Sequence, residues 1–175
     1  NLDEVHVIGT EESAMSFWRR VFAIELGIPI NSMVKGIRKI SNTEMQMIKK
    51  KYEGKIFFHE LRDFNEIIDL IFSLKVPYIW IDHINAIGYP GGDMYKGIIS
   101  LIGYEKDWLL TNPESVIVNL SQVNTKQMKF KGRLFPSKED AYMSSVLEQA
   151  SREFISFYYP YKDIIDKENQ HKFAG

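Results

Sequence analysis

The chain has 175 residues, with 22 Lys and Arg against 23 Asp and Glu, and 45% of the residues are apolar. This length and composition are typical of one globular domain with a single core, and they exclude a wholly disordered chain. The chain has no cysteine, which excludes disulfides, thiolate zinc sites and thiol nucleophiles and favours a reducing compartment. No apolar run approaches the roughly 20 residues that span a bilayer, so we expect no membrane partner. A net charge of −1 gives no overall attraction to nucleic acid, so such a contact needs a local basic patch.

The first half of the chain alternates short β-rich segments with segments of helical period. Apolar residues from Ala14 to Leu26 recur at spacings of three and four, and Gly27 and Pro29 end that helix. In chain order we predict a strand over 4–9, a helix over 14–26, a capped helix from Ser41 to about Tyr52, a strand over 55–61, and a helix from its cap at Asp63 to Leu74.

The second half continues the alternation. The segment 77–84 is the most apolar one, which suits a strand buried on both faces of a parallel sheet. A loop over 88–93, a helix over 94–110 and a strand over 115–121 follow, then a polar, basic segment over 122–142, a short helix to Gln149 and a strand over 152–159. We therefore predict one α/β domain over residues 1–175, a layered sandwich with a mainly parallel sheet. A loop as long as 122–142 is usually functional or disordered.

Acidic and amide side chains gather where four of the predicted strands end. Ligands of open α/β sheets bind beyond the carboxyl ends of the strands. A metal–nucleotide site needs a carboxylate for magnesium, a second carboxylate to activate water and an amide that senses phosphate. The four ends read Thr10-Glu11-Glu12-Ser13, His59-Glu60, Asp82-His83 and Ser121-Gln122-Val123-Asn124.

Each of these residues also has a purely structural interpretation. Asp82 fits a turn after a strand, Glu11 and Glu12 fit first-turn acids favoured by a helix dipole, and Gln122 fits a loop residue that caps a carbonyl. The four histidines have no metal-ligand spacing, so we expect no zinc site.

A basic cluster in the long loop has two interpretations as well. Lys126, Lys129, Lys131 and Arg133 fit a solvated face, the usual fate of a charge run. The neighbouring Phe130 and Phe135 favour contact with single-stranded nucleic acid, because aromatic and cationic side chains together suit a single strand.

The order of these motifs resembles the RecA-type ATPase domain of DnaB-family replicative helicases, phage primase–helicases included. Thr10 to Ser13 is similar to the family's "LE-[EM]-S" strand end, and Ile79 to Ile84 to its Walker B strand. Val116 to Asn124 resembles "V-I-x-L-S-Q-L-N". Farther on, Ser145 to Ala150 resembles "S-G-x-I-E-Q-x-A", and Arg152 to Pro160 resembles "D-V-V-L-F-L-Y-R-P". The resemblance covers residues 5–161.

The resemblance implies a RecA-like three-layer sandwich that binds ATP and magnesium in a bacterial or phage-infected cytoplasm. It implies that Glu11 is the catalytic carboxylate, that Asp82 holds magnesium through water and that Gln122 senses the γ-phosphate. It also implies a hexameric ring that translocates on single-stranded DNA, with primase as a further partner. The DNA contacts would come from two loops, with Lys126, Lys129, Lys131 and Arg133 in one and Lys96 in the other.

The family's P-loop and arginine-finger segments have no counterpart in the 175 residues. Gly91 and Gly92 form a turn, because no G-x-x-x-x-G-K-[ST] surrounds them. We therefore expect the residues to be a fragment of a larger helicase, inactive alone. Two alternatives stay open: a RecA- or clock-type ATPase, and a non-catalytic α/β nucleotide-binding or interaction module of flavodoxin or receiver type.

Overall fold

The computed structural model describes residues 4–122, 144–153 and 155. The chain divides into two compact units, residues 1–121 and 122–175. The described helix of the second unit is α7 (Ser144–Ala150). No helix in the described ranges is long and apolar enough to cross a bilayer.

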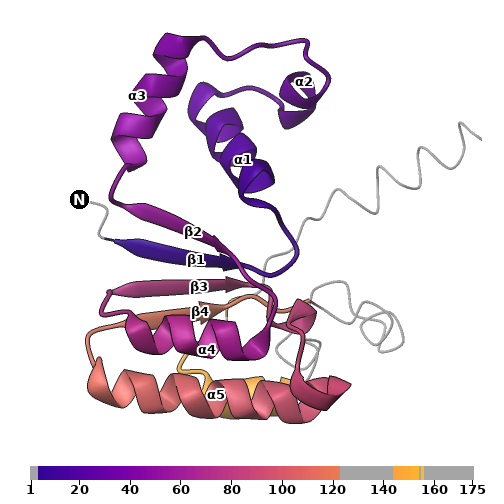
Figure 1. The fold of residues 1–175 in the computed structure, drawn as a ribbon, viewed down its shortest axis with the longest axis vertical. Helices are drawn as coiled ribbons and strands as arrows, with labels where there is room; N and C mark the ends of the chain where they lie inside the picture. The colour runs from indigo at the N-terminus through magenta and orange to yellow at the C-terminus, as the bar shows by residue number, and fades with distance from the viewer. Residues whose placement is uncertain (1–3, 123–143, 154, 156–175) are drawn as a thin grey trace, which may run out of the picture. The chain divides into compact units, whose positions relative to one another are not determined.

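The first unit is an alternation of strands and helices, as predicted (Figure 1). Its elements are β1 (Val5–Gly9), α1 (Ala14–Leu26), α2 (Ile30–Val34), α3 (Asn42–Tyr52), β2 (Ile56–Glu60), α4 (Phe64–Ser73), β3 (Tyr78–Asp82), the 3-10 turns η1 (Ile84–Ala86) and η2 (Pro90–Gly92), α5 (Met94–Thr111) and β4 (Val116–Asn119). The sequence did not predict α2, because five residues are too few to show a helical period.

Side-chain caps fix where the helices begin. The Ser13 hydroxyl accepts from the Ser16 N–H at the start of α1, and Ser41 with Glu44 forms the predicted capping box of α3. The Asp63 carboxylate caps α4. At the other end of α1, Gly27 adopts φ 61°, a left-handed conformation that glycine enters at low cost and that ends the helix.

The four strands form one parallel sheet in the order β2-β1-β3-β4. Gly9 at the end of β1 lies level with Glu60 at the end of β2 and with Asp82 at the end of β3. The carboxyl ends of these three strands therefore meet at one edge of the sheet, as the sequence predicts.

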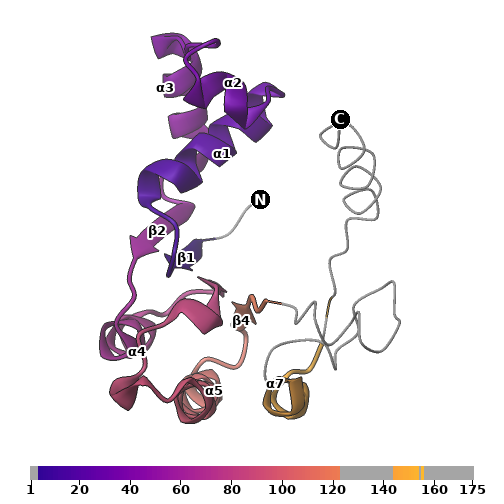
Figure 2. The same ribbon diagram turned by 90° about the vertical axis from the view of Figure 1, so that its right-hand side faces the viewer.

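One face of the sheet packs on α4 and α5, which lie side by side (Figures 1 and 2). Ile79 and Ile81 of β3 are fully buried there, as are Ile67 of α4 and Leu101 of α5. Burial of one such aliphatic side chain stabilises a fold by about 1.5–3 kcal/mol. This interface is the core of the unit.

The opposite face of β3 is half exposed. Tyr78 is 37% and Trp80 is 41% exposed, so the prediction of a strand buried on both faces is wrong. The helix α1 reaches this face at the β2 edge, where Phe17 stacks on Phe58 with ring centroids 4.6 Å apart. The group α1, α2 and α3 lies toward β2 and away from β4 in both views, which leaves the β3 aromatic side chains uncovered (Figures 1 and 2).

Two predicted segments fall mainly outside the described residues. The basic segment 122–142 is described only at Gln122. Of the predicted strand 152–159, only Arg152, Glu153 and Ile155 are described, and none of the three lies in a strand. The remainder of that strand stays a prediction.

Candidate active site

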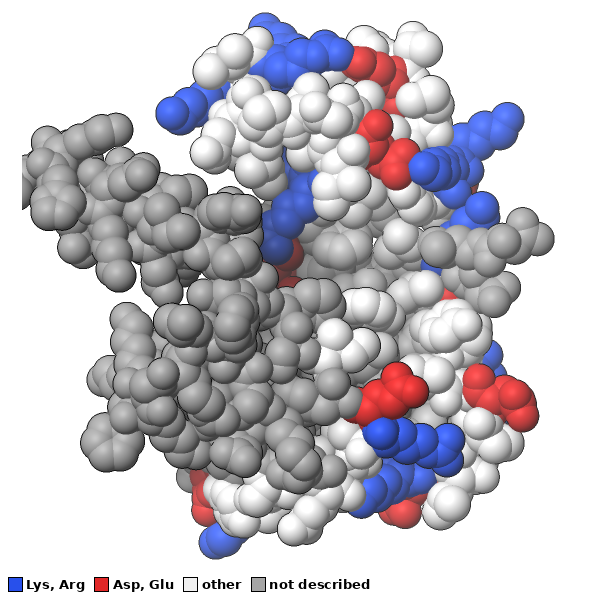
Figure 3. Space-filling model, turned by 180° about the vertical axis from the view of Figure 1, so that it is seen from behind, with Lys and Arg blue, Asp and Glu red and all other residues white. Residues whose placement is uncertain are grey.

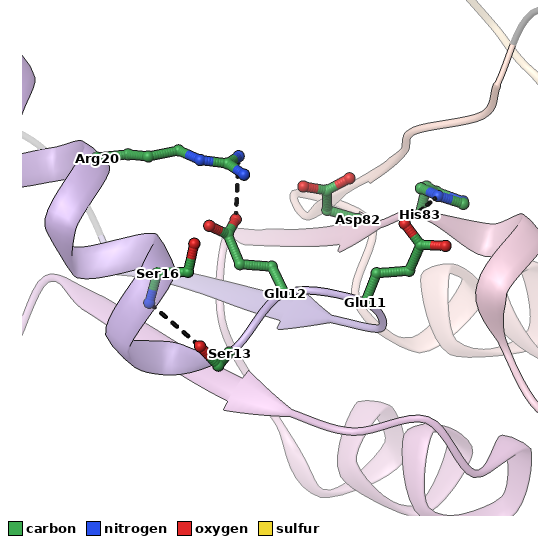
Figure 4. Close-up of a pocket in the computed structure, with 7 residues that line it drawn as sticks. All are labelled: Glu11, Glu12, Ser13, Ser16, Arg20, Asp82 and His83. Carbon is green, nitrogen blue, oxygen red and sulfur yellow. Dashed lines mark hydrogen bonds and ion pairs between the residues drawn. The ribbon is translucent and has the colours of Figure 1, made fainter. Parts of the chain in front are cut away.

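A pocket of about 540 Å³ opens where β1 and β3 end (Figure 4). The Thr10 N–H donates to the Asp82 carbonyl oxygen at 2.8 Å, which continues the strand pairing by one residue. The side chains of Glu11 and Asp82, predicted from positions 71 residues apart, are thereby brought into one pocket. Its lining residues are Glu11, Glu12, Ser13, Ser16, Arg20, Asp82 and His83.

Glu11 and Glu12 have different partners although they are adjacent in sequence. The Glu11 carboxylate is 62% exposed, and its Oε2 lies 3.2 Å from Nε2 of His83. The Glu12 carboxylate is 11% exposed, and its Oε2 lies 3.1 Å from a guanidinium nitrogen of Arg20. Figure 4 shows the two carboxylates pointing apart, Glu11 toward the end of β3 and Glu12 toward α1. The exposed carboxylate, Glu11, is the one that a ligand or a water can reach.

Asp82 is the last residue of β3 and its side chain lies between Arg20 and His83 in the pocket (Figure 4). No group of three His, Asp or Glu side chains in the described ranges could hold a metal ion by itself. Magnesium usually takes one or two protein carboxylates and fills its other positions with water and substrate phosphates. The single carboxylate of Asp82 fits that kind of site and does not fit an all-protein metal cage.

Thr10 joins the two strand ends beneath the pocket. Its hydroxyl is buried, accepts from the His83 N–H at 2.9 Å, and lies 2.8 Å from the His83 carbonyl oxygen and 3.0 Å from that of Asp82. A hydroxyl has one proton and two lone pairs, so it satisfies one backbone donor and shares its proton with the two acceptors. Thr10 therefore holds the backbone on which Asp82 and His83 are mounted.

Two of the four histidines form a pair away from this pocket. His6 Nδ1 lies 2.9 Å from Nε2 of His59, and His6 Nε2 lies 2.9 Å from a carboxylate oxygen of Glu4. Burial, and then the charge of His6, lower the pKa of the His59 imidazole. Two ring nitrogens at hydrogen-bond distance leave no room for a metal ion between them, in keeping with the expectation that the histidines bind no zinc.

The predicted phosphate sensor and DNA-binding residues are not part of this geometry. Gln122 is exposed. Lys96, in the first turn of α5, is 82% exposed and pairs with Asp93 at 3.5 Å. Lys126, Lys129, Lys131 and Arg133 lie outside the described residues. The roles assigned to these six residues stay predictions.

A basic region on α1–α3 was not predicted. Residues 14–55 contain nine Lys or Arg against three Asp or Glu, and Figure 3 shows basic side chains spread over these helices. Part of this charge has a structural role: Arg38 pairs with Glu44, Lys51 with Glu25 at 2.6 Å, and the last-turn lysines favourably oppose the α3 dipole. We assign it no ligand.

Arg20 and His83 are the site residues that sequence reasoning missed. Arg20 stands on α1, and its pairing with Glu12 depends on how α1 leaves the sheet. His83 had a visible signal, because it follows Asp82 directly at a strand end. Nothing in the sequence alone indicated that its ring turns toward Glu11.

Comparisons with known proteins rest on structure alone, because no family model and no curated protein matches the sequence. The chain is similar to a solved ATPase domain of a DnaB-like helicase, with a TM-score of 0.73, 16% identity and coverage of 95% of this chain and 62% of that one. It is also similar to a DnaB-like replicative helicase whose structure addresses its interactions with primase, with a TM-score of 0.68, 15% identity and coverage of 85% and 38%. The fold is therefore that of a RecA-like helicase ATPase domain, and the predicted fold class is confirmed. The chain spans less than two thirds of either structure.

Proposed function

We propose that this chain belongs to the ATPase motor of a hexameric replicative DNA helicase, which couples ATP hydrolysis to movement on single-stranded DNA and to duplex unwinding. The observation that carries the proposal is the meeting of Glu11 and Asp82 in one pocket, at adjacent ends of parallel strands. The fold around that pocket resembles helicase ATPase domains, which supports the same function.

The two carboxylates would divide the chemistry. Asp82 would hold magnesium through a water ligand, and the bound ion would supply positive charge to the β- and γ-phosphates. Glu11 would orient the attacking water and accept its proton, which requires an accessible carboxylate within hydrogen-bond reach. Its 62% exposure meets that requirement, and the pairing of Glu12 with Arg20 makes Glu12 the poorer candidate. The phosphate-binding P-loop would come from sequence beyond these 175 residues.

Coupling to DNA would involve the segment that follows β4. Gln122 would detect the γ-phosphate, and a shift of the following loop would move Lys126, Lys129, Lys131 and Arg133 along the DNA backbone, with Lys96 in a second loop. A loop whose order or position depends on a γ-phosphate is a known form of switch. Lysine contacts to phosphate are independent of sequence, as a translocating motor needs.

The proposed assembly is a ring with primase as a partner. One of the two similar structures is a DnaB-like helicase described with its primase interactions, which supports this choice of partner. We place the protein in the cytoplasm of a bacterium or of a phage-infected host.

The test is ATP hydrolysis by the natural full-length protein, with and without single-stranded DNA. Glu11→Gln should lower kcat by about 10²–10⁴-fold and preserve ATP binding, because the carboxylate acts on the water. Asp82→Asn should weaken magnesium-dependent ATP binding as well as hydrolysis. Glu66→Gln, an exposed acid on α4, is the matched control and should change neither. Hydrolysis that survives both Glu11→Gln and Asp82→Asn contradicts the proposal.

One observation favours a second candidate, a receiver-like phosphoacceptor module. The order β2-β1-β3-β4 is also found in flavodoxin-like sheets. In this chain an acid pair follows the first strand, Asp82 ends the third, and Ser121 stands beyond the fourth. Magnesium-dependent binding of beryllium fluoride that Asp82→Asn abolishes, in a protein that hydrolyses no ATP, would favour this candidate over the helicase.

A further inference from the structure

We propose that His83 is a positioning residue for Glu11: its imidazole holds the Glu11 carboxylate at the mouth of the pocket, ready to act on water. The inference deepens the proposed function and rests on it, because it assigns His83 a task in the hydrolysis assigned to Glu11. The two side chains meet with 3.2 Å between His83 Nε2 and Glu11 Oε2, and Figure 4 draws this contact as a dashed line.

The backbone of His83 is fixed on both sides. The buried Thr10 hydroxyl accepts from the His83 N–H at 2.9 Å and lies 2.8 Å from its carbonyl oxygen. The next residue, Ile84, is fully buried, and its N–H donates to the Leu120 carbonyl oxygen at 3.1 Å. These contacts tie His83 to both strands that flank β3, so its ring starts from a backbone with little freedom.

The two partners differ sharply in exposure. The His83 side chain is 13% exposed, whereas that of Glu11 is 62% exposed. An exposed Glu side chain samples many rotamers, and fixing such a long side chain costs roughly 1.5–2 kcal/mol. The anchored imidazole therefore determines the place of the more mobile carboxylate.

The neighbouring acid shows that the contact is selective. Glu12 is one residue away, yet it pairs with Arg20 on α1. His83 follows Asp82, so one short segment carries both the proposed magnesium acid and the group that places the proposed base. With Oε2 held by His83, Oε1 of Glu11 is the oxygen left to accept the proton of the attacking water. Groups that orient a ligand or catalytic side chain in this way typically affect activity by about 10–100-fold.

The experiment compares three substitutions in the natural full-length protein: His83→Leu, His83→Gln and Glu11→Gln. Leucine removes the N–H donor and keeps an apolar bulk, whereas glutamine keeps an N–H that can reach a carboxylate. We expect His83→Leu to lower kcat by about 10–100-fold. The KM for ATP and the Kd of a non-hydrolysable ATP analogue should stay within about twofold, and His83→Gln should recover most of kcat. Thermal unfolding of each variant checks that the fold is intact.

A double substitution isolates the route through Glu11. If His83 acts by placing Glu11, adding His83→Leu to Glu11→Gln should cause little further loss of kcat. Equal losses for the leucine and glutamine variants, or full additivity in the double variant, would overturn the inference. So would an unchanged kcat for His83→Leu in a protein whose hydrolysis requires Glu11, and the proposed function would then stand. Absence of any hydrolysis that depends on Glu11 would instead overturn the proposed function together with the inference.

Discussion

The side-chain amide of Asn119 on β4 donates to a carboxylate oxygen of Glu105 on α5 at 2.8 Å, inside the core. Glu105 is 5% exposed, and its second carboxylate oxygen and the Asn119 side-chain oxygen are buried without a hydrogen-bond partner in the described part of the chain. Burial raises the pKa of Glu105 to about 7, although the Asn119 hydrogen bond works in the opposite direction. The carboxyl group is thus most stable here in its neutral form.

This pair predicts a pH dependence of stability. The pKa of Glu105 is about 7 in the folded chain against an ordinary 4.5, so the folded state binds the proton more tightly. The free energy of unfolding should therefore fall as pH rises from about 4.5 to 7, by at most about 3 kcal/mol at 1.36 kcal/mol per pKa unit. Glu105→Gln should remove this decline and be the more stable form at pH 8. Urea unfolding at pH 5.5 and pH 8 measures it, and equal pH slopes for both proteins would contradict it.

The His6–His59 pair predicts a pH effect of opposite sign. The pKa of His59 is lowered below its ordinary 6.5, so the unfolded chain binds the proton more tightly. Stability from this residue should be fully present above pH 6.5 and decline as pH falls below it. His59→Gln should flatten the acid side of the stability profile without changing it above pH 7. Thermal unfolding between pH 5 and pH 8 provides the measurement, and an acid limb that stays as steep in the variant would refute the assignment.

Gly97 on α5 allows the helix to approach the Tyr89 ring. A Cβ at this position would overlap the ring near its attachment to the chain, where the side chain has little room to move. Gly97→Ala should destabilise the fold by about 1–3 kcal/mol through overpacking. Gly103→Ala in the same helix meets no atom within 4 Å and should stabilise by up to about 1 kcal/mol. Chemical denaturation of the two variants tests this, and a stabilising Gly97→Ala would show that Tyr89 gives way.

The basic loop predicts a salt-dependent interaction with DNA. Replacing Lys126, Lys129, Lys131 and Arg133 together by Ala in the full-length protein should weaken single-stranded DNA binding. Each lost phosphate contact should reduce the slope of log K against log salt by about 0.7. Basal ATP hydrolysis should persist, because Glu11 and Asp82 are unchanged, while its stimulation by DNA falls. An unchanged salt slope with intact stimulation would move the DNA contact elsewhere, first to the loop that contains Lys96.

The sequence by itself determined the kinds of element and the edge at which the site lies. Local signals sufficed, because caps such as Ser41 and Asp63 act within one turn and apolar periodicity reports a helix face directly. The placement of Glu11 beside Asp82 could also be expected, since carboxyl ends of parallel strands meet at one edge of a sheet.

Only the tertiary structure decided which side chains are partners and which are buried. Glu11 and Glu12 are the same residue type at adjacent positions, yet one contacts His83 and the other Arg20, because the chain turns between β1 and α1. Trp80 and Ile81 are both apolar, but only Ile81 faces α4 and α5. Glu105 reads as an ordinary surface acid until α5 is packed under β4. These outcomes depend on segments far apart in the chain, and a local pattern does not record the direction from which a distant segment arrives.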